Sequence, residues 1–377
     1  MSLTPIPAAE ALQLLDSFDS IIDARTEAEF DEDHLPAALN WPTLNNTQRI
    51  EVGTTYKQIN AFEAKKRGAA MAAANIAAHI NQHVIAKPRD WKPLTYCWRG
   101  GKRSGSLSLI LSEIGFQVRI IEGGYKAFRA ALVADIPRLV EQINFIVICG
   151  PTGSGKTRLL QALAALPATE TSATDAPCAP QVLDLEALAN HRSSVLGVLP
   201  GLPQPTQKAY DTLVWNALRR FDPTRPVYVE SESKKVGNVA VPVSLMDKMR
   251  SSPCLNLQLP LEERVALLME DYDFFVKDTA FFCDRLEALV SARGHEVVKR
   301  WQALALANDC ETVVRELLLQ HYDPVYFQSM KRNFKQYEQS HTISPPGHTQ
   351  LAMQALAQQL GHSKPRLLHT SAVFCCN

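Results

Sequence analysis

The sequence predicts an α/β protein in which two parallel-sheet units follow one another and a mainly helical region comes last. Strand-like and helix-like segments alternate over about the first 130 residues, which favours a parallel sheet covered by helices. A second apolar strand enters a glycine-rich loop at residues 143–150. From Leu261 onward, apolar residues recur at helical spacing. We therefore expect three regions, 1–136, 137–260 and 261–377.

The first region should alternate between strands and helices along its whole length. A short apolar strand at 21–24 ends in an acid, and the segment after it begins as a helix and is then interrupted by Pro36 and Pro42. Further along, the patterns predict a helix at 63–83, a strand at 93–97, a helix at 104–116 that stops near Gly115, and a strand, a Gly-Gly turn and a helix within 117–132.

The second region repeats this alternation, and the third does not. After the strand at 143–150 we expect a helix, a polar Pro-rich stretch at 167–180, and strands in "QVLDLE", "RPVYVESES" and "CLNLQLP". Helices should then continue to about residue 340, with interruptions at Gly294 and Pro324. The tail holds Pro-Pro-Gly and a short helix rich in Ala, Gln and Leu.

Composition and charge indicate a globular cytoplasmic protein. The 39 basic and 39 acidic residues cancel, so net charge gives no support to a nucleic-acid partner, although a local basic patch is compatible with it. The eight cysteines form no C-x-x-C pair and read as reduced thiols. The N-terminus lacks the pattern of a signal peptide, and no apolar run reaches the ~18 residues of a membrane helix, so we expect no membrane partner.

The first chemically informative stretch is "TYCWRGGKRSG" at 95–105, where a strand runs into a glycine loop and then a helix. Backbone N–H groups and the helix N-terminus would surround the sulfur of Cys97 with positive charge, which favours a thiolate, a persulfide, a perselenide or a bound oxyanion. We predict Cys97 as the catalytic residue. The anion-binding loop around it comprises Arg99, Gly100, Gly101, Lys102, Arg103 and Ser104.

Two protein families share this loop chemistry. "IIDARTEAEFDEDHLPAALNWP" and "LSEIGFQVRIIEGGYKAFR" resemble the opening and the close of a rhodanese domain, which implies a rhodanese-like fold and a chalcogen carried on Cys97. The five residues between Cys97 and Arg103 also fit the CX5R loop of phosphatases, and the usual rhodanese loop is one residue shorter. Tyr96 stands where those phosphatases commonly have His, which speaks weakly against phosphate-ester hydrolysis.

The second informative stretch, "GPTGSGKT" at 150–157, fits the P-loop pattern G-x-x-x-x-G-K-[ST] without a mismatch. It lies between an apolar strand and a helix, the context that makes such a match specific. We predict a phosphate or diphosphate wrapped by the loop amides, with a lysine against its charge and a threonine reaching Mg²⁺. The predicted diphosphate-binding residues are Gly150, Gly153, Ser154, Gly155, Lys156 and Thr157.

Polar residues that follow the predicted strands are candidates for Mg²⁺ or substrate contacts. Asp184, Glu230 and Glu232 each come after an apolar strand, where a metal-bound water would be held. Helix capping or simple surface exposure explains such acids about equally well. His191 and Arg192 lie in a His-Arg-Ser-Ser run that could bind an anion or a nucleic-acid phosphate, or form a solvated loop.

The order of these motifs resembles the bacterial tRNA 2-selenouridine synthase family over about residues 5–340. The resemblance is carried by "EVGTTYKQINAFEAKKRGA", "CWRGGKRS", "GPTGSGKT", "DLEALANHR", "PTQKAYDTLVW" and "VESESKKVG". It implies exchange of sulfur for selenium in the wobble 2-thiouridine of tRNA, with selenophosphate as donor, through an S-geranyl intermediate made from geranyl diphosphate. "HRSSVLG" departs from the usual His-Arg-Gly-Ser run of the family.

The resemblance also sets expectations for cofactors and partners. It implies tRNA as the partner and a selenophosphate-producing enzyme upstream, with Mg²⁺ as an optional ion, no structural metal and no organic prosthetic group. Lys234-Lys235, and Lys331-Arg332 together with Phe334 and Tyr337, are candidate tRNA contacts. Two other classes stay open, namely a rhodanese-type tRNA sulfurtransferase with an accessory nucleotide-binding domain, and a non-enzymatic anion-binding module.

Overall fold

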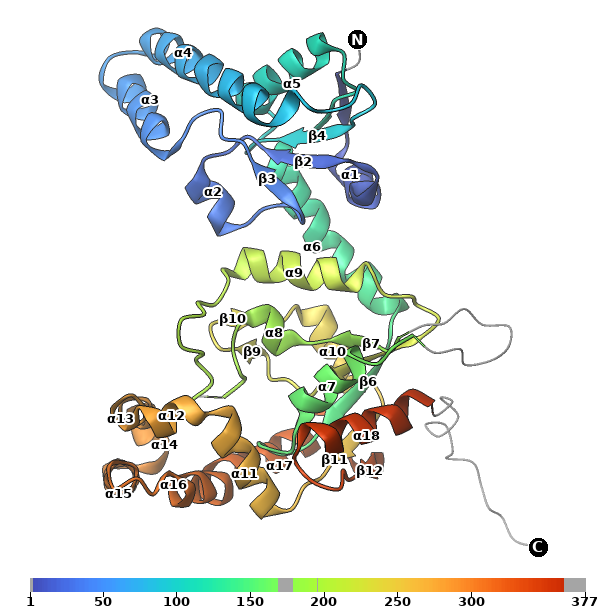
Figure 1. Cartoon of the computed structure of the whole chain (residues 1–377), viewed down its shortest axis with the longest axis vertical. Coiled ribbons are helices and arrows are strands. Elements are labelled where there is room, and N and C mark those ends of the chain that lie inside the picture. Colours follow the sequence, from blue (N-terminus) through green and yellow to red (C-terminus); the bar gives the residue numbers. More distant parts are fainter. Residues whose placement is uncertain (1–2, 169–178, 195, 363–377) are drawn as a thin grey trace, which may run out of the picture. The chain divides into compact units, whose positions relative to one another are not determined.

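The computed structural model describes residues 3–168, 179–194 and 196–362 of the chain. They divide into two compact units. Unit 1 comprises residues 1–138 and 205–216, and unit 2 comprises 139–204 and 217–377 (Figure 1). The Pro-rich stretch expected at 167–180 and the last part of the tail lie largely outside the described residues.

Unit 1 is built on a parallel sheet with the strand order β1-β5-β4-β2-β3. Its strands are β1 (Thr4–Ile6), β2 (Ser20–Asp23), β3 (Ala38–Asn40), β4 (Pro93–Tyr96) and β5 (Arg119–Ile121). In the register, Asp23 of β2 lies opposite Tyr96 of β4 and Asn40 of β3. The carboxyl ends of these three strands therefore meet at one edge of the sheet, and Cys97 directly follows β4 at that edge.

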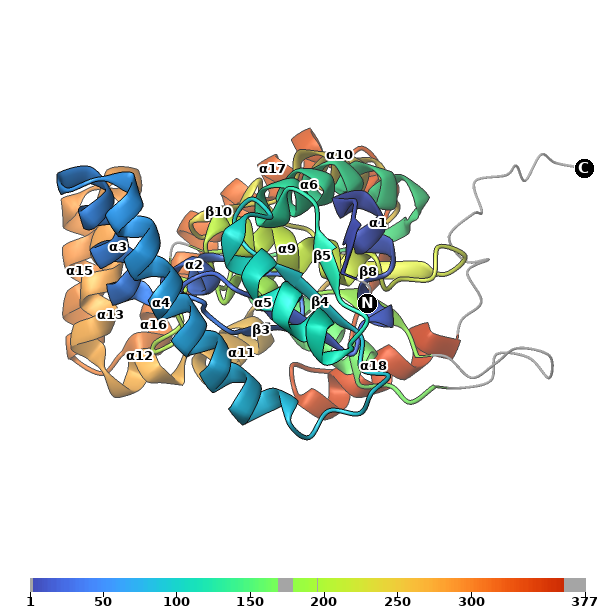
Figure 2. The same cartoon turned by 90° about the horizontal axis from the view of Figure 1, so that it is seen from above.

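Helices pack on both faces of this sheet. They are α1 (Ala8–Gln13), α2 (Glu27–Glu32), α3 (Asn46–Gln58), α4 (Ala61–His79), α5 (Lys102–Ile114) and α6 (Gly124–Gln142). One core cluster joins Ile22 of β2 to Ile76 of α4 and to Leu107 and Leu111 of α5. Gly115 ends α5 in the left-handed conformation, as its sequence predicted. Both views show α3 and α4 running side by side as a hairpin (Figures 1 and 2).

Helix α9 (Gln207–Leu218) belongs mainly to unit 1, although it lies in the second region of the sequence. Its Asp211 pairs with Arg129 of α6, and the indole of Trp215 donates to Asp135 at 2.9 Å. The Trp215 ring also meets Phe128 edge-on. These polar and aromatic contacts hold a segment that is distant in sequence against α6.

Unit 2 contains a second parallel sheet with the order β12-β11-β6-β8-β7. Its strands are β6 (Asn144–Cys149), β7 (Gln181–Leu183), β8 (Pro226–Glu230), β11 (Cys254–Leu257) and β12 (His341–Ile343), and β9 (Lys235–Val236) pairs with β10 (Val239–Ala240) in a separate antiparallel ribbon. The burial pattern of β6 is almost continuous, as expected for a central parallel strand. Around this sheet lie α7 (Lys156–Ala164), α8 (Leu185–Ala189), α10 (Val243–Ser251) and α18 (Gln350–His362).

The segment from Leu261 onward forms a helical bundle within unit 2. It comprises α11 (Leu261–Asp271), α12 (Asp273–Lys277), α13 (Thr279–Leu286), α14 (Val290–Arg293), α15 (His295–Leu306), α16 (Cys310–Glu316) and α17 (Asp323–Asn333). Phe282, Trp301 and Val313 are at the centre of its core. Gly294 separates α14 from α15, as expected. The interruption expected at Pro324 is not seen, because a π-helical turn at Leu317–Tyr322 runs directly into α17 and Pro324 lies just after it.

The predicted α/β fold class is therefore confirmed, including two parallel sheets and a helical region. The sequence analysis missed β12, which joins the sheet beside β11 through a parallel ladder that starts at Leu255 opposite His341. It did predict the tail helix, and α18 packs its Met353 and Leu356 into the core cluster of the P-loop sheet. The chain thus returns from the helical bundle to complete unit 2.

Candidate functional site

In unit 1, the sulfur of Cys97 lies at the start of α5, and its residue is 3% exposed. The N–H of Gly101 donates to the sulfur at 3.2 Å, and the hydroxyl of Ser104 donates at 3.1 Å. One donor is a backbone N–H of the loop and the other is a hydroxyl in the first turn of the helix, next to its positive N-terminal end. This arrangement suits a negatively charged sulfur or an atom attached to it.

The Gly-Gly turn after β5 fixes the shape of this loop. The N–H of Tyr125 donates to the carbonyl of Cys97 at 2.8 Å, and the N–H of Lys126 donates to that of Trp98 at 3.1 Å. A Cβ on Gly124 would come within 2.2 Å of the Cys97 carbonyl oxygen, and its φ of +60° already favours glycine. The turn therefore requires glycine because two backbone segments approach closely there.

The cations of the loop have different surroundings. Arg99 and Lys102 are exposed. The guanidinium of Arg103 makes two hydrogen bonds to Glu29 of α2, at 2.5 and 3.1 Å. Arg103 therefore orients α2 beside the loop, and its part in binding an oxyanion, like that of the other loop residues, stays a prediction.

A buried network supports the same sheet edge. The carboxylate of Asp23 accepts three side-chain hydrogen bonds from Arg25, and the Arg25 guanidinium lies 4.0 Å from the centre of the Tyr125 ring. Arg25 is 1% exposed, so a partner at this distance is needed to offset its desolvation. The sequence motif Asp-x-Arg thus has a structural role behind the loop.

In unit 2, the P-loop connects β6 to α7 as the sequence predicted. A Cβ on Gly150 would come within 2.6 Å of the Leu257 carbonyl oxygen, so this position also requires glycine. Lys156 donates from its Nζ to the Gly150 carbonyl at 2.8 Å, which folds the side chain over the loop. The hydroxyl of Tyr326 accepts the N–H of Gly150 at 2.5 Å and ties α17 to the loop.

An acidic cluster lies next to the end of the P-loop. The hydroxyl of Thr157 lies 3.2 Å from Glu230 and 3.3 Å from Glu186. Ligand atoms of Glu186, Glu230 and Glu232 all lie within 4.8 Å of one another. One oxygen of Glu230 is buried without a hydrogen-bond partner. Such a set of carboxylates with an unsatisfied oxygen can hold a divalent cation.

The charges in this cluster oppose one another. Burial raises the pKa of Glu232 to about 8, and the neighbouring Glu186 carboxylate adds to the rise. Burial likewise raises the pKa of Glu230 well above its ordinary value, with Glu186 and Glu232 contributing repulsion. Lys156 acts in the opposite direction on both groups. A bound cation would relieve this repulsion.

The remaining predicted residues line the same cavity, which has a volume of about 990 Å³. Asp184 caps α8 by accepting the Ala187 N–H at 2.8 Å. His191 is buried, with its Nδ1 unpartnered. Arg192 donates to the Asp271 carbonyl at 2.8 Å and lies over the Tyr272 ring. The structure therefore brings four of the predicted P-loop residues, the acids and the His-Arg pair together around one space, whereas Gly150 and Ser154 do not line it.

Sequence reasoning missed two residues of this site. Glu186 follows Asp184 by two positions, and an Asp-x-Glu pattern after a strand was a signal that could have identified it. Tyr326 gave no such signal, because it lies 176 positions from Gly150 and reaches it only through the fold of α17. Phe334 and Tyr337, which were expected to be available to RNA, are buried to 5% and 9% exposure because they pack into unit 2.

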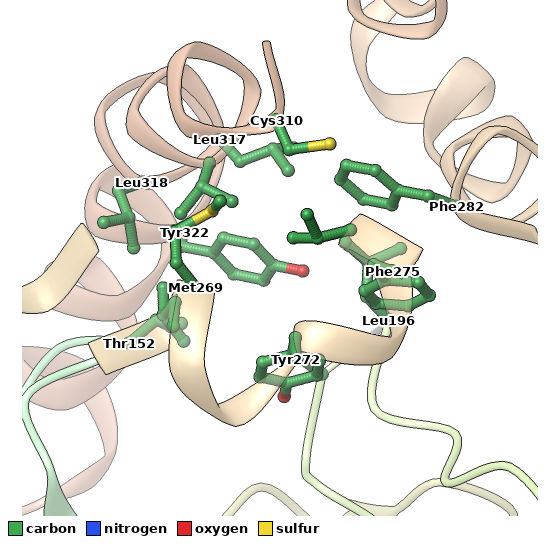
Figure 3. Close-up of a pocket in the computed structure, with 14 residues that line it drawn as sticks. Thr152, Leu196, Met269, Tyr272, Phe275, Phe282, Cys310, Leu317, Leu318 and Tyr322 are labelled. Atoms are coloured by element: carbon green, nitrogen blue, oxygen red, sulfur yellow. The ribbon is translucent and has the colours of Figure 1, made fainter. Parts of the chain in front are cut away.

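A second, apolar pocket adjoins the P-loop cavity and shares Thr152, Ser194, Leu268, Tyr272 and Tyr322 with it. Figure 3 shows its wall of aromatic and aliphatic side chains from the helical bundle, with Cys310 and Phe282 away from Thr152 in this view. The pocket is small, with a cavity volume of about 50 Å³. It suits a slender apolar group joined to a ligand in the P-loop cavity.

Two known protein families match the chain, one in unit 1 and the other mainly in unit 2. Residues 7–131 match the family described as "Rhodanese-like domain", and residues 143–289 match "tRNA 2-selenouridine synthase AAA domain". Within the described residues, no helix has the length and apolar character that crossing a membrane requires.

Several curated proteins are similar over most of the chain, and each of these three is called tRNA 2-selenouridine synthase. The protein of Nitrosomonas europaea is 38% identical over 67% of this chain, which spans 63% of that relative's length. The one from Bdellovibrio bacteriovorus is 32% identical, with 72% of this chain and 69% of the relative covered. The Hydrogenovibrio crunogenus protein is 30% identical, with 84% and 90% covered.

Proposed function

The chain belongs to the tRNA 2-selenouridine synthase family, and from this membership we propose that it replaces the sulfur of a 2-thiouridine in tRNA by selenium. The observation that carries the proposal is a P-loop whose cavity adjoins an apolar pocket. The same chain holds Cys97 with its donors Gly101 and Ser104, which we call the cradle. One site fits a diphosphate with an apolar tail, and the other fits a nucleophilic sulfur that reacts with an oxyanion donor. The two sites would divide the reaction into two steps.

The first step would activate the sulfur of the base. Geranyl diphosphate would lie with its diphosphate on the P-loop and its tail in the apolar pocket lined by Met269, Phe275 and Leu317 (Figure 3). The sulfur of 2-thiouridine attacks the carbon bound to the diphosphate, the C–O bond breaks and diphosphate leaves. Lys156 stabilises the charge on the departing group. The product is S-geranyl-2-thiouridine in tRNA.

The second step would exchange the chalcogen. The Cys97 thiolate, which accepts hydrogen bonds from the Gly101 N–H and the Ser104 hydroxyl, would attack the phosphorus of selenophosphate. The P–Se bond breaks and hydrogen selenide leaves, and water later hydrolyses the S–P bond to release phosphate. Selenium then bonds to C2 of the base, the C2–S bond breaks and geranylthiol leaves. Alkylation in the first step is what makes the sulfur a good leaving group. Arg99 and Lys102, both exposed at this loop, would attract the oxygens of the donor.

Nucleoside mass analysis of tRNA from cells with and without this chain tests the proposal. Cells that contain the chain should yield 2-selenouridine when selenium is supplied, and cells that lack it should retain 2-thiouridine. If 2-thiouridine were found only in cells that contain the chain, and no 2-selenouridine were formed, the result would favour the tRNA sulfurtransferase. The absence of any tRNA change would favour a binding module.

We further propose that the acidic cluster holds Mg²⁺. Glu186, Glu230, Glu232 and the Thr157 hydroxyl would hold the ion, which supplies positive charge against the leaving diphosphate. The raised carboxyl pKa values give this proposal a stability signature. A carboxyl whose folded-state pKa lies above its unfolded value contributes stability below the unfolded pKa, and that contribution is lost as the pH rises through the folded pKa.

In the metal-free protein, stability should therefore fall as the pH rises toward and through about 8, the pKa of Glu232. Mg²⁺ binds the ionised carboxylates, so it should raise the thermal unfolding midpoint more at pH 8.5 than at pH 6. Thermal scans at both pH values, with and without Mg²⁺, measure this difference. Glu232→Gln should reduce it, whereas Glu296→Gln on the exposed surface of α15 should not. An equal response to Mg²⁺ in both variants would contradict the assignment.

Filling the apolar pocket should weaken geranyl binding without weakening diphosphate binding. Cys310→Phe adds bulk on the side away from Thr152 (Figure 3) and should displace part of the tail. Loss of about two buried methylene groups corresponds to roughly a tenfold rise in KM for geranyl diphosphate. Inhibition by inorganic diphosphate should stay unchanged in Cys310→Phe. The control Leu306→Phe changes an exposed side chain and should alter neither the KM for geranyl diphosphate nor the inhibition by diphosphate. A parallel loss of diphosphate inhibition in Cys310→Phe would point to misfolding and not to the pocket.

A further inference from the structure

The helical hairpin α3–α4 of unit 1 ends in a tip that combines exposed aromatic, aliphatic and basic side chains. Tyr56, Ile59 and Phe62 are 61%, 58% and 67% exposed. Few residues of the hairpin are buried: Thr55 in α3, and Ala64 and Ile76 in α4. Large apolar side chains of this kind gathered at one exposed place indicate an interaction site.

The charge of the hairpin favours a polyanion. Residues 46–79 contain five Lys and Arg residues against two Glu, within a chain whose net charge is zero. Glu63 pairs with Lys66 at 2.7 Å, and Glu51 pairs with Arg67 at 3.5 Å. These pairs neutralise both acids, so the positive excess comes from the remaining basic residues. They are Arg49, Lys57 and Lys65, all exposed.

The base of the hairpin is attached to the sheet edge that carries Cys97. Asn46 lies at the start of α3. Its side-chain oxygen accepts a hydrogen bond from the Ala28 N–H at 3.1 Å, and its backbone N–H donates to the Glu27 carboxylate at 2.9 Å. Both of these partners belong to α2, which is bonded to the Cys97 loop through Glu29 and Arg103. Asn75 of α4 also donates to the Thr43 carbonyl at 3.1 Å. The hairpin is therefore a positioned arm of the cradle and not a free extension.

We infer that the tip of α3–α4 binds the unpaired bases of the tRNA substrate and guides them toward Cys97. Exposed aromatic rings stack on bases that are not held in a duplex, and nearby Lys and Arg residues contact phosphates. At 1.5 Å per residue, α4 is about 28 Å long, so the arm reaches well beyond the cradle. Phe334 and Tyr337, the aromatic residues expected from the sequence, are buried and cannot stack in this way.

This inference rests on the proposed tRNA substrate, and binding measurements separate the two. Wild-type protein and a Tyr56→Ala/Phe62→Ala variant would be titrated with tRNA that contains 2-thiouridine. Stacking is worth about 1–3 kcal/mol per base, so the variant should bind at least about fivefold more weakly. Leu109→Ala/Ile110→Ala on α5 removes exposed apolar area from the same unit and should leave binding unchanged. Failure of the wild-type protein to bind tRNA would reject the proposed function itself.

The basic residues give a second and independent measurement. Lys57→Ala/Lys65→Ala should make the slope of log K against log salt less steep by about two units. Each lost phosphate contact reduces the magnitude of this slope by about one unit. Lys92→Ala, exposed elsewhere in unit 1, should keep the parent slope. Because these side chains are exposed, all variants should unfold at the parent temperature.

Photo-cross-linking identifies what lies against the tip. Benzoylphenylalanine would replace Phe62 at the tip, with the cradle left unchanged. The tip should then cross-link to the unpaired loop of the tRNA and not to its acceptor end. Parent affinity in both the aromatic and the lysine variants would overturn the inference. Cross-linking to a protein in place of tRNA would overturn it too, because the tip would then be a protein-docking surface.

Discussion

Lys156→Ala should abolish geranyl transfer while largely preserving selenium exchange on tRNA that is already geranylated. The Lys156 ammonium lies over the P-loop, 2.8 Å from the Gly150 carbonyl, where it would meet a bound diphosphate. Loss of such a charge-assisted contact to a leaving group typically costs 10²–10³-fold, and we expect a loss of about that size. Mass analysis of nucleosides from tRNA incubated with geranyl diphosphate measures the first step. Synthetic S-geranyl tRNA with selenophosphate measures the second.

Lys299→Ala removes an exposed lysine from α15 of the same unit and serves as the matched control. It should leave both steps at the parent rate. Equal loss of geranylation and of selenium exchange in Lys156→Ala would show that the two activities share one site. It would also contradict the proposal that the P-loop binds the diphosphate of the geranyl donor.

Local sequence signals predicted the parts of the fold whose structure depends on adjacent residues. The apolar strand β6, the P-loop glycines and the start of α7 follow each other directly, so their geometry is encoded within about 20 residues. The same holds for β4, the Cys97 loop and α5. In both places one strand end and one helix start determine where the backbone amides point.

Long-range contacts could not be predicted in this way. Strand β12 has three residues and is specified by its pairing with β11, more than 80 positions earlier. Helix α9 has an ordinary amphipathic sequence, and tertiary contacts such as the Arg129–Asp211 pair and the Thr212–Asp33 hydrogen bond show that it belongs with unit 1. The pairing of Arg103 with Glu29 likewise depends on the position of α2. Sequence spacing alone does not contain this information.

The apolar pocket illustrates the same limit for function. Its lining residues come from the P-loop, from the loop after α8, from helices α11, α12, α13 and α16, and from the turns next to these helices. Helical spacing from Leu261 onward predicted helices but did not show that their apolar side chains surround a pocket. The fold leaves a narrow space among these side chains beside the P-loop, and that space is what supports a substrate with an apolar tail.

Cys97→Ser should have the opposite effect to Lys156→Ala, abolishing selenium incorporation and sparing geranyl transfer. A serine hydroxyl at this position could still accept from Gly101 and Ser104, so the cradle should keep its shape. It cannot release the selenium of selenophosphate, because an alkoxide is far harder to form than a thiolate and the neutral hydroxyl is a much weaker nucleophile. We expect the exchange rate to fall by roughly 10³-fold or more, as for the loss of other catalytic nucleophiles.

The diagnostic product of Cys97→Ser is an accumulated intermediate. With geranyl diphosphate and selenophosphate both present, S-geranyl-2-thiouridine should build up in the tRNA, and 2-selenouridine should be missing from the nucleoside mass spectrum. Cys283→Ser is the matched control, since that thiol donates only a weak hydrogen bond to the Gln302 carbonyl at 3.5 Å. If Cys97→Ser still produced 2-selenouridine at the parent rate, selenophosphate would have to react with the geranylated base directly. The role of the cradle would then be to bind the donor, and Cys97 would not be the nucleophile that releases its selenium.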